Sequence, residues 1–359
     1  MKILLVLHNY NVPISDPCCY PLGYMTISAV LKRAGHDVTI NNQNLYHALP
    51  LEGYDAVLFT GFEHFLEDIK RDAAICKGLG IHTVLGGALA TFKPEEMLQH
   101  VDTVVVGEGE NVVEQALTTS GIIYGTKPDL NTIPLPDYEG FGVAEYHKRN
   151  GFKHIGVLTQ RGCPNRCRFC AQTCKTQARD IDQVMAEIDS YGDVDTVIIN
   201  DNTLNTSKSR FMEICGRMTK PWTAAIRVDR FDEEMAIAAK KSRCRYFVVG
   251  IESFRQDKLD AMRKGIKVEQ IYSCLDLLHK YDIGYHGCIL TGLPGETTED
   301  IIEELKELPA GYNFFPVLVQ PFVGTEYQTR SISDEDAANF TALFTEIATS
   351  RNMTVFPTL

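Results

Sequence analysis

The amino-acid sequence lacks several features that would assign it to common classes of protein. No apolar stretch reaches the roughly 18 residues of a membrane-spanning helix, so we expect no membrane span. Basic residues are few, 35 Lys and Arg against 47 Asp and Glu, and the net charge of −12 argues against a nucleic-acid partner, although it leaves room for a local basic groove. No Gly-x-Gly-x-x-Gly run follows the first apolar segment, so a nicotinamide or flavin dinucleotide site is not supported.

Cysteine is plentiful, but most of the eleven cysteines are scattered, and no signal peptide precedes them. This is not the framework of a secreted, disulfide-bonded protein, so we expect reduced thiols in a cytoplasmic protein. With 359 residues, of which 44% are apolar, the chain can bury a large core and should divide into about two domains.

Three cysteines do stand close together. Cys163, Cys167 and Cys170 form a C-x3-C-x2-C motif directly after an apolar stretch, Ile155 to Leu158. A zinc site or a fully ligated cluster needs four protein ligands, whereas three thiolates leave one iron open to a small molecule. The motif therefore predicts an iron–sulfur site with an open iron. Cys174 is the alternative fourth ligand, but the sequence has neither a paired C-x2-C motif nor a trailing Cys-Pro that would support a closed site.

Residues 1–130 alternate between β-rich runs and helical patterns. The runs lie at 1–7, 38–40, 56–60, 83–87 and 101–106. This alternation predicts an α/β fold with a Rossmann-like, doubly wound parallel sheet. Ligands of such sheets bind at the carboxyl ends of the strands, which directs attention to the loops 8–21, 60–62, 86–87 and 107–110. Glycines in three of these loops would either admit a bulky ligand or form tight turns.

A second α/β unit is expected after a proline-containing linker, residues 131–150. It covers residues 151–330, and residues 331–359 read as a C-terminal helix and tail. Its predicted strands lie at 155–159, 196–200, 223–227, 246–251, 285–291 and 315–320. Six parallel strands with crossovers predict a partial (β/α)6 barrel with its site at the carboxyl ends. Polar residues follow the first five of these strands, and although each could cap a helix or form a turn, together they predict a site on one rim.

The second unit resembles the radical S-adenosylmethionine (SAM) superfamily over about residues 150–330. The cysteine motif, Gly250-Ile-Glu-Ser-Phe with residues 259–265, and Gly292-Leu-Pro-Gly-Glu with residues 297–300 carry the resemblance. It implies that Cys163, Cys167 and Cys170 hold a [4Fe–4S] cluster whose open iron binds SAM. It further implies cofactor contacts from Phe169, Asn200, Glu252, Ser253, Leu290 and Gly292. Because Asn200-Asp-Asn-Thr replaces the usual Gly-Gly-Glu motif, the contact to the amino group of SAM stays open.

The first 125 residues resemble the cobalamin-binding domain fused to many radical SAM enzymes. Pro21-Leu-Gly-Tyr-Met, Val84-Leu-Gly-Gly-Ala-Leu-Ala-Thr and the run from Val101 to Glu110 carry this resemblance. It implies a cobalamin over the strand ends, with contacts from Thr60, Gly61, Gly86, Gly87, Gly107, Glu108, Gly109 and Glu110. The D-x-H-x-x-G signature is absent, which leaves His8, His64, a water or nothing below the cobalt.

Together the two resemblances imply a cobalamin-dependent radical SAM (class B) C-methyltransferase. The 5′-deoxyadenosyl radical would remove a hydrogen from an unactivated carbon, and cobalamin would supply the methyl group. A one-electron reductant such as ferredoxin or flavodoxin would be a partner. The candidate residues for the substrate cavity are Tyr24, Asp201, Arg227, Tyr312 and Gln320; Tyr312 could equally be a core aromatic.

Alternatives remain open both for the methyl acceptor and for the type of reaction. The short tail after residue 330 suggests an open cavity and a bulky acceptor, such as the glutamine of methyl-coenzyme M reductase that a related methylase modifies, with a metabolite or lipid precursor as the other option. The chain could instead catalyse methylthiolation, cyclisation or epimerisation with a vestigial cobalamin domain. A methylthiotransferase would need further cluster ligands, for which Cys18, Cys19 and Cys76 are the candidates. A cobalamin or redox sensor is the remaining alternative.

Overall fold

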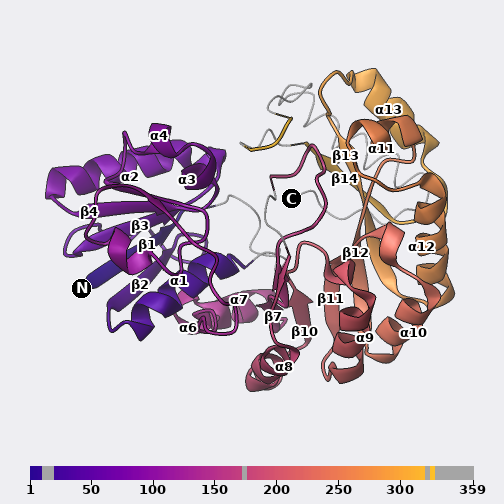
Figure 1. Ribbon diagram of the computed structural model, residues 1–359, viewed down its shortest axis with the longest axis horizontal. Helices are drawn as coiled ribbons and strands as arrows, with labels where there is room; N and C mark the ends of the chain where they lie inside the picture. Colours follow the sequence, from indigo (N-terminus) through magenta and orange to yellow (C-terminus); the bar gives the residue numbers. More distant parts are fainter. Residues whose placement is uncertain (10–19, 172–175, 320–323, 328–359) are drawn as a thin grey trace. The chain divides into compact units, whose positions relative to one another are not determined.

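The computed structural model describes residues 1–9, 20–171, 176–319 and 324–327 (Figure 1). The chain divides into two compact units, Met1–Lys153 and His154–Leu359. Each unit is built around its own six-stranded sheet, and every strand pair within these two sheets is parallel. None of the described helices is long and apolar enough to cross a membrane.

The first unit contains a sheet in the order β2-β1-β3-β4-β5-β6. Its strands are β1 (Lys2–Leu7), β2 (Asp37–Asn42), β3 (Ala56–Thr60), β4 (His82–Gly86), β5 (Thr103–Val106) and β6 (Gly121–Tyr124). The central strand β1 is buried from Ile3 to Leu7 because helices cover both faces of the sheet. The strand order reverses between β1 and β3, the position at which doubly wound sheets bind ligands.

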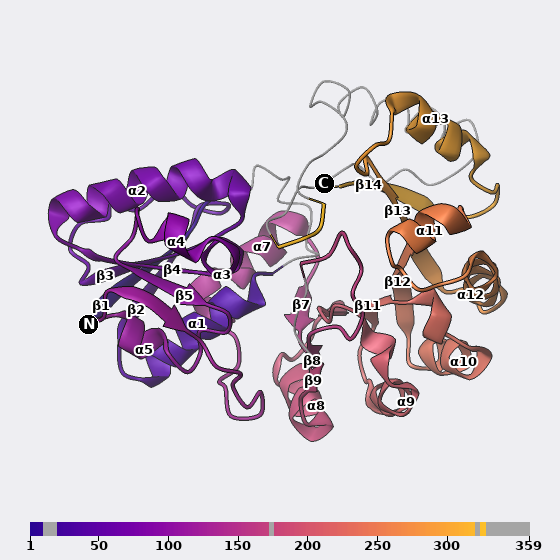
Figure 2. The same cartoon turned by 45° about the horizontal axis from the view of Figure 1, so that its top comes forward.

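The helices of the first unit lie on both sides of its sheet, with α2, α3 and α4 on one side and α1 and α5 on the other (Figure 2). Their bounds are α1 (Leu22–Arg33), α2 (Leu66–Leu79), α3 (Ala88–Phe92), α4 (Pro94–Met97), α5 (Val113–Ala116), α6 (Tyr138–Phe141) and α7 (Val143–Asn150), with a 3-10 turn η1 (Glu63–Phe65). The expected linker, residues 131–150, belongs to this unit. Asp137 accepts hydrogen bonds from Ser28 Oγ at 2.6 Å and from the backbone N–H of Gly140, and it pairs with Lys32 at 2.7 Å.

The second unit contains a sheet in the order β14-β13-β12-β11-β10-β7. Its strands are β7 (His154–Val157), β10 (Thr196–Ile199), β11 (Trp222–Ile226), β12 (Cys244–Glu252), β13 (Gly284–Thr291) and β14 (Phe314–Leu318). Each strand pairs with the next one along the chain in this sheet, as in a barrel that has not closed. The predicted α/β fold, a doubly wound sheet followed by a partial (β/α)6 barrel, is confirmed.

The helices of the second unit cover one face of its sheet (Figure 2). They are α8 (Ile181–Ser190), α9 (Lys208–Arg217), α10 (Glu233–Lys241), α11 (Gln256–Ala261), α12 (Val268–Lys280) and α13 (Thr298–Glu307), with 3-10 turns η2 (Leu204–Thr206) and η3 (Val228–Arg230). Between this layer and the sheet, Phe211, Trp222, Phe231 and Phe247 pack edge to face or tilted, with ring centroids 5.6–6.4 Å apart. A short antiparallel pair, β8 (Gln160–Arg161) and β9 (Gln177–Ala178), flanks the loop that carries the cysteine motif.

Candidate functional site

The cysteine loop, residues 158–171, follows β7 in the second unit. Cys163 and Cys167 are free, half-buried thiols, and Cys170 is exposed. The backbone N–H of Cys170 donates to the carbonyl of Cys167 at 3.2 Å, which forms a turn between these two residues. Asn165 Nδ2 lies 3.2 Å from Cys163 Sγ. Cys174, the alternative fourth ligand, lies outside the described residues.

The base of the cysteine loop is held by Asp201, which follows β10. Its carboxyl group accepts hydrogen bonds from the backbone N–H groups of Thr159 and Gln160 at 2.7 and 3.0 Å, and from Thr159 Oγ1 at 2.5 Å. Burial raises the pKa of Asp201 to about 6, and the hydrogen bonds from Thr159 and Gln160 lower it. Asp201, a candidate for the substrate cavity, is buried and makes these hydrogen bonds at the base of the cysteine loop.

The far side of the cysteine loop is attached to the C-terminal end of α11. The backbone N–H of Arg168 donates to the carbonyl of Met262 at 3.0 Å, and Arg168 Nη1 donates to the carbonyl of Ala261 at 3.1 Å. Arg168 also pairs with Glu326 at 3.1 Å. The thiols are therefore carried by a loop that is fixed at both its base and its tip.

A group of charged side chains, here called the charge cluster, lies beside this loop and consists of Arg227, Asp229, Glu252 and Lys264. Lys264 Nζ lies 2.5 Å from Glu252 Oε1, and both side chains are less than 10% exposed. Arg227 donates to the backbone carbonyl of Lys264 at 2.9 Å and pairs with Asp229 at 2.9 Å. Burial raises the pKa of the Cys167 thiol, whereas the positive charges of Lys264 and Arg227 lower it.

The other residues predicted to contact SAM occupy the same rim in different ways. Asn200 directly follows β10, and its Oδ1 atom is buried with no hydrogen-bond donor among the residues that the structure describes. Ser253 is fully buried and donates to Glu304 Oε1 at 2.5 Å, so its hydroxyl belongs to a network with Glu304 and Lys258. Leu290 lies near the end of β13 and Gly292 follows that strand with φ +75°.

This set of donors fits an iron–sulfur cluster that binds SAM. Within the described ranges, no group of three or more His, Cys, Asp or Glu side chains converges as the ligands of a single metal ion would. Thiolates that bind different irons of one cluster need not converge in this way. The buried acceptor Oδ1 of Asn200 lies where the Gly-Gly-Glu motif was expected, and it suits the amino group of SAM.

In the first unit, glycines make the ends of β3 and β4 accessible to a bulky ligand. A Cβ atom at Gly87, where φ is +83°, would lie 2.6 Å from Thr60 Oγ1, whereas a Cβ at Gly86 would meet nothing within 4 Å. Thr91 ties two of the predicted ligand loops together, because its Oγ1 donates to the carbonyl of Gly87 at 2.8 Å and accepts from the N–H of Gly107 at 3.0 Å. These strand ends fit a broad, flat group such as cobalamin. Sequence reasoning missed Thr91, although it lies within the quoted Gly-Gly-Ala-Leu-Ala-Thr segment.

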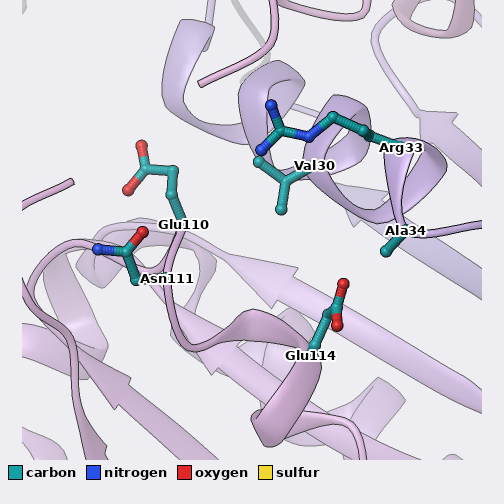
Figure 3. Close-up of a pocket in the computed structure, with 6 residues that line it drawn as sticks. All are labelled: Val30, Arg33, Ala34, Glu110, Asn111 and Glu114. Carbon is teal, nitrogen blue, oxygen red and sulfur yellow. The ribbon is translucent and has the colours of Figure 1, made fainter. Parts of the chain in front are cut away.

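The loop after β5 carries the remaining predicted cobalamin contacts. Gly107 has φ +82°, and a Cβ at Gly109 would lie 3.4 Å from Ile27 of α1. Glu108 follows Gly107 in the same loop. Glu110 faces a hollow of about 290 Å³ that Val30, Arg33, Ala34, Asn111 and Glu114 also line (Figure 3). The structure thus places Glu110 beside helix α1.

Two histidines were candidate ligands below the cobalt. His8 follows β1 but is 1% exposed, stacks on Phe59, and its Nε2 atom lies 3.0 Å from Asp72 Oδ2. It therefore belongs to the core between the sheet and α2. His64 is exposed in η1, and partial burial lowers its pKa.

The remaining substrate candidates take different places within their own units. Tyr24 is buried, and its hydroxyl lies within hydrogen-bond distance of the carbonyls of Val6 and Leu58, at 2.9 and 2.8 Å. Tyr312 precedes β14, at the amino end of that strand, and donates to Asp276 at 2.8 Å. Within the second unit, Asp201 and Arg227 lie on the rim that carries the cysteines, whereas Tyr312 lies at the opposite end of the sheet. Gln320 lies outside the described residues.

Comparisons with known proteins agree with this arrangement. The sequence profile of the radical SAM superfamily matches residues 157–308, and that of the B12 binding domain matches residues 15–117. An uncharacterized methyltransferase of Pyrococcus horikoshii is 26% identical and aligns over 93% of this chain and 84% of its own. Bacteriochlorophyllide d C-12(1)-methyltransferase of Chlorobaculum tepidum is 27% identical over 86% of this chain and 72% of its own.

Two solved structures share the fold. The radical SAM methyltransferase TsrM from Kitasatospora setae aligns with a TM-score of 0.68 at 19% identity, over 91% of this chain and 75% of TsrM. The cobalamin-dependent radical SAM enzyme OxsB aligns with a TM-score of 0.69 at 16% identity, over 85% of this chain and 51% of OxsB. The two matched domains confirm the predicted cofactors, a [4Fe–4S] cluster, SAM and cobalamin. The chain therefore combines a radical SAM domain with a B12 binding domain, and it is similar to cobalamin-dependent radical SAM methyltransferases.

Proposed function

We propose that this chain methylates an unactivated carbon of its acceptor. The observation that carries the proposal is the presence, in one chain, of a B12 binding domain and a radical SAM domain whose three cysteines lie on one anchored loop. When bound, the cluster and SAM supply a radical that abstracts hydrogen, and cobalamin supplies the methyl group. Each methyl transfer would consume two SAM molecules and two electrons, and it would release 5′-deoxyadenosine, methionine and S-adenosylhomocysteine.

The residues of the chain bind and orient these groups. Cys163, Cys167 and Cys170 would each hold an iron, and Asn200 Oδ1 would accept a hydrogen bond from the amino group of SAM. Asp201 keeps the base of the cysteine loop in place through its three hydrogen bonds. In the first unit, Gly86 and Gly87 would let the corrin ring approach the backbone, which side chains at these positions would prevent.

The acceptor is the finer part of the proposal. A residue of a protein, such as a glutamine of methyl-coenzyme M reductase, is the acceptor expected from the sequence. The names of similar proteins give two other kinds of acceptor, bacteriochlorophyllide for the Chlorobaculum enzyme and tryptophan for TsrM. These two kinds of acceptor are distinguished by whether the transferred methyl group is found on a protein or on a small molecule.

The test is anaerobic turnover of the reconstituted holoenzyme with methyl-labelled SAM, dithionite and an extract of the native host. Mass spectrometry is then applied to both the digested proteins and the small molecules. We expect label on a carbon of one acceptor, with equal amounts of 5′-deoxyadenosine and S-adenosylhomocysteine. Label on neither cobalamin nor any product would overturn the proposal. Formation of 5′-deoxyadenosine without methyl transfer would indicate another radical reaction, and its absence with an intact cluster would indicate a sensor.

One of the rival reactions receives little support from the first unit. A methylthiotransferase would need further cysteine ligands there, and Cys18 and Cys19 lie outside the described residues. Cys76 is fully buried in α2, within the apolar core between that helix and the sheet. Burial raises the pKa of the Cys76 thiol to about 11, which disfavours the thiolate that a cluster needs.

A further inference from the structure

A buried lysine lies beside the loop that carries the three cysteines. Lys264 follows the segment, residues 261–262, whose carbonyls hold Arg168 of the cysteine loop. Its ammonium nitrogen lies 5.8 Å from the centroid of the Phe169 ring, and Phe169 is the residue between Arg168 and Cys170. The same nitrogen lies 2.5 Å from Glu252 Oε1. One positive and one negative charge are thus buried together next to the predicted cluster ligands.

The surrounding residues are arranged to accommodate this pair. A Cβ atom at Gly250 would lie 2.8 Å from Lys264 Nζ and 3.0 Å from Glu252 Oε1, so a side chain there would displace one of the two charged groups. Glu252 itself has φ +69°, a conformation that costs a non-glycine residue free energy. Such strain persists where the surrounding structure enforces it, and it is concentrated at functional sites.

Stability alone does not explain the pair. Removing two charges from water costs several kcal/mol per ion, and well-packed apolar residues in place of a buried ion pair are often neutral or stabilising. The loop already has two backbone anchors, through Arg168 at its tip and Asp201 at its base. A role in stability would therefore be served equally well by two apolar side chains.

The charge cluster contains two cations, Arg227 and Lys264, and two anions, Asp229 and Glu252. Arg227 pairs with Asp229 at 2.9 Å, and Lys264 pairs with Glu252 at 2.5 Å. Lys264 Nζ also lies 5.8 Å from the centroid of the Phe169 ring in the cysteine loop. Removal of either charge of the Lys264–Glu252 pair would therefore leave one uncompensated buried charge beside this loop.

We propose that Lys264 and Glu252 set the reduction potential of the [4Fe–4S] cluster, with Lys264 raising it and Glu252 lowering it. This inference shares one premise with the proposed function, namely that the three cysteines hold a cluster. Reduction adds one electron and one negative charge to the cluster without making or breaking a bond. A nearby cation stabilises the reduced form, and a nearby anion destabilises it.

The test is a redox titration of the full-length chain after anaerobic reconstitution, without SAM, with dithionite as the electron donor. Electron paramagnetic resonance measures the reduced fraction at each poise, and iron and sulfide analysis verifies that the cluster is intact. We expect Lys264→Met to lower the ratio of reduced to oxidised cluster about tenfold at a fixed poise, which corresponds to about 59 mV for one electron. Lys264→Arg should restore most of the wild-type potential.

The second part of the test removes the negative charge and should shift the reduction potential in the opposite direction. Glu252→Gln should raise the reduced fraction, and the double variant with Lys264→Met should return toward wild type. Lys258→Met is the matched control, because the Lys258 side chain is only 9% exposed and pairs with Glu296 and Glu304. It should leave the potential unchanged.

Equal potentials in wild type, Lys264→Met and Glu252→Gln would overturn the inference, as would shifts of the same sign in both single variants. A shift in the Lys258→Met control as large as that in Lys264→Met would also overturn it. If Lys264→Met fails to retain a cluster, the reduction potential of Glu252→Gln alone decides the test. The reduction potential is measured on the cluster alone, so the test of Lys264 and Glu252 stays valid even if the chain transfers no methyl group. If the wild-type chain forms no cluster, both this inference and the proposed function are overturned.

Discussion

At the base of the cysteine loop, the carboxyl group of Asp201 exchanges contact with water for three hydrogen bonds from Thr159 and Gln160. Burial outweighs these bonds and raises the pKa of Asp201 to about 6. The folded state therefore binds a proton more tightly than the unfolded state does. The contribution of Asp201 to stability is fully present below the unfolded pKa, near 4, and is lost as the pH rises through about 6.

Asp201→Asn should remove this pH dependence. Asparagine can accept from the same backbone N–H groups and donate to Thr159 Oγ1, so the loop should keep its geometry. Between pH 4 and pH 7, the free energy of unfolding of wild type should fall relative to that of the variant by roughly 3 kcal/mol. Urea unfolding of the cluster-free chain at several pH values measures this difference. Parallel pH profiles for the two proteins would contradict it.

Single residues also show which features of the site could not be predicted from the sequence. Asp201 was selected because it follows a predicted strand, but its partner Thr159 is 42 residues away in the sequence and becomes visible only in the fold. Tyr312 precedes both the predicted strand, 315–320, and the observed β14, so the sequence already placed it at the amino end of that strand, away from the predicted site. Lys264 was quoted within a motif without a role, since a lysine in a sequence does not reveal that it is buried.

At the scale of elements, buried parallel strands were predictable because their apolar runs are continuous. The runs at β1, β3 and β13 begin and end within one residue of the predicted bounds. Strand β6 is apolar but has only four residues, and β8 and β9 have two residues each, so all three are too short to be recognised from the sequence pattern. The loops at the strand ends could be predicted from their glycines. The hydrogen bonds by which Thr91 joins two of these loops could not be predicted from the sequence.

Gly87→Ala should weaken cobalamin binding. Gly87 combines φ +83° with ψ −154°, which is essentially restricted to glycine, and the new Cβ would lie 2.6 Å from Thr60 Oγ1. The matched control is Gly53→Ala, where φ is +82° and a Cβ would meet nothing within 4 Å. Both variants should lose about 1 to 3 kcal/mol of stability, whereas only Gly87→Ala should raise the Kd for cobalamin, by roughly tenfold. Equal cobalamin affinity in the two variants would show that the β4 loop does not contact the corrin.

At the scale of the whole molecule, the account depends on three cysteine ligands rather than four. Alanine at position 163, 167 or 170 should lower 5′-deoxyadenosine formation by roughly 100-fold or more, because each thiolate holds one iron. Cys215→Ala is the control, since this cysteine is buried in α9. Cys174→Ala should keep the cluster and the activity. Loss of the cluster in Cys174→Ala would mean that no iron is open to SAM.

The central claim is that the methyl group passes through cobalamin to a carbon. The most direct measurement loads the reconstituted chain with cobalamin that carries a trideuterated methyl group, then adds unlabelled SAM, dithionite and an extract of the native host for a single turnover. We predict that the first methylated product carries all three deuterium atoms in a methyl group that is joined to the acceptor by a new carbon–carbon bond. A first product whose methyl group is unlabelled, and therefore comes directly from SAM, would contradict it.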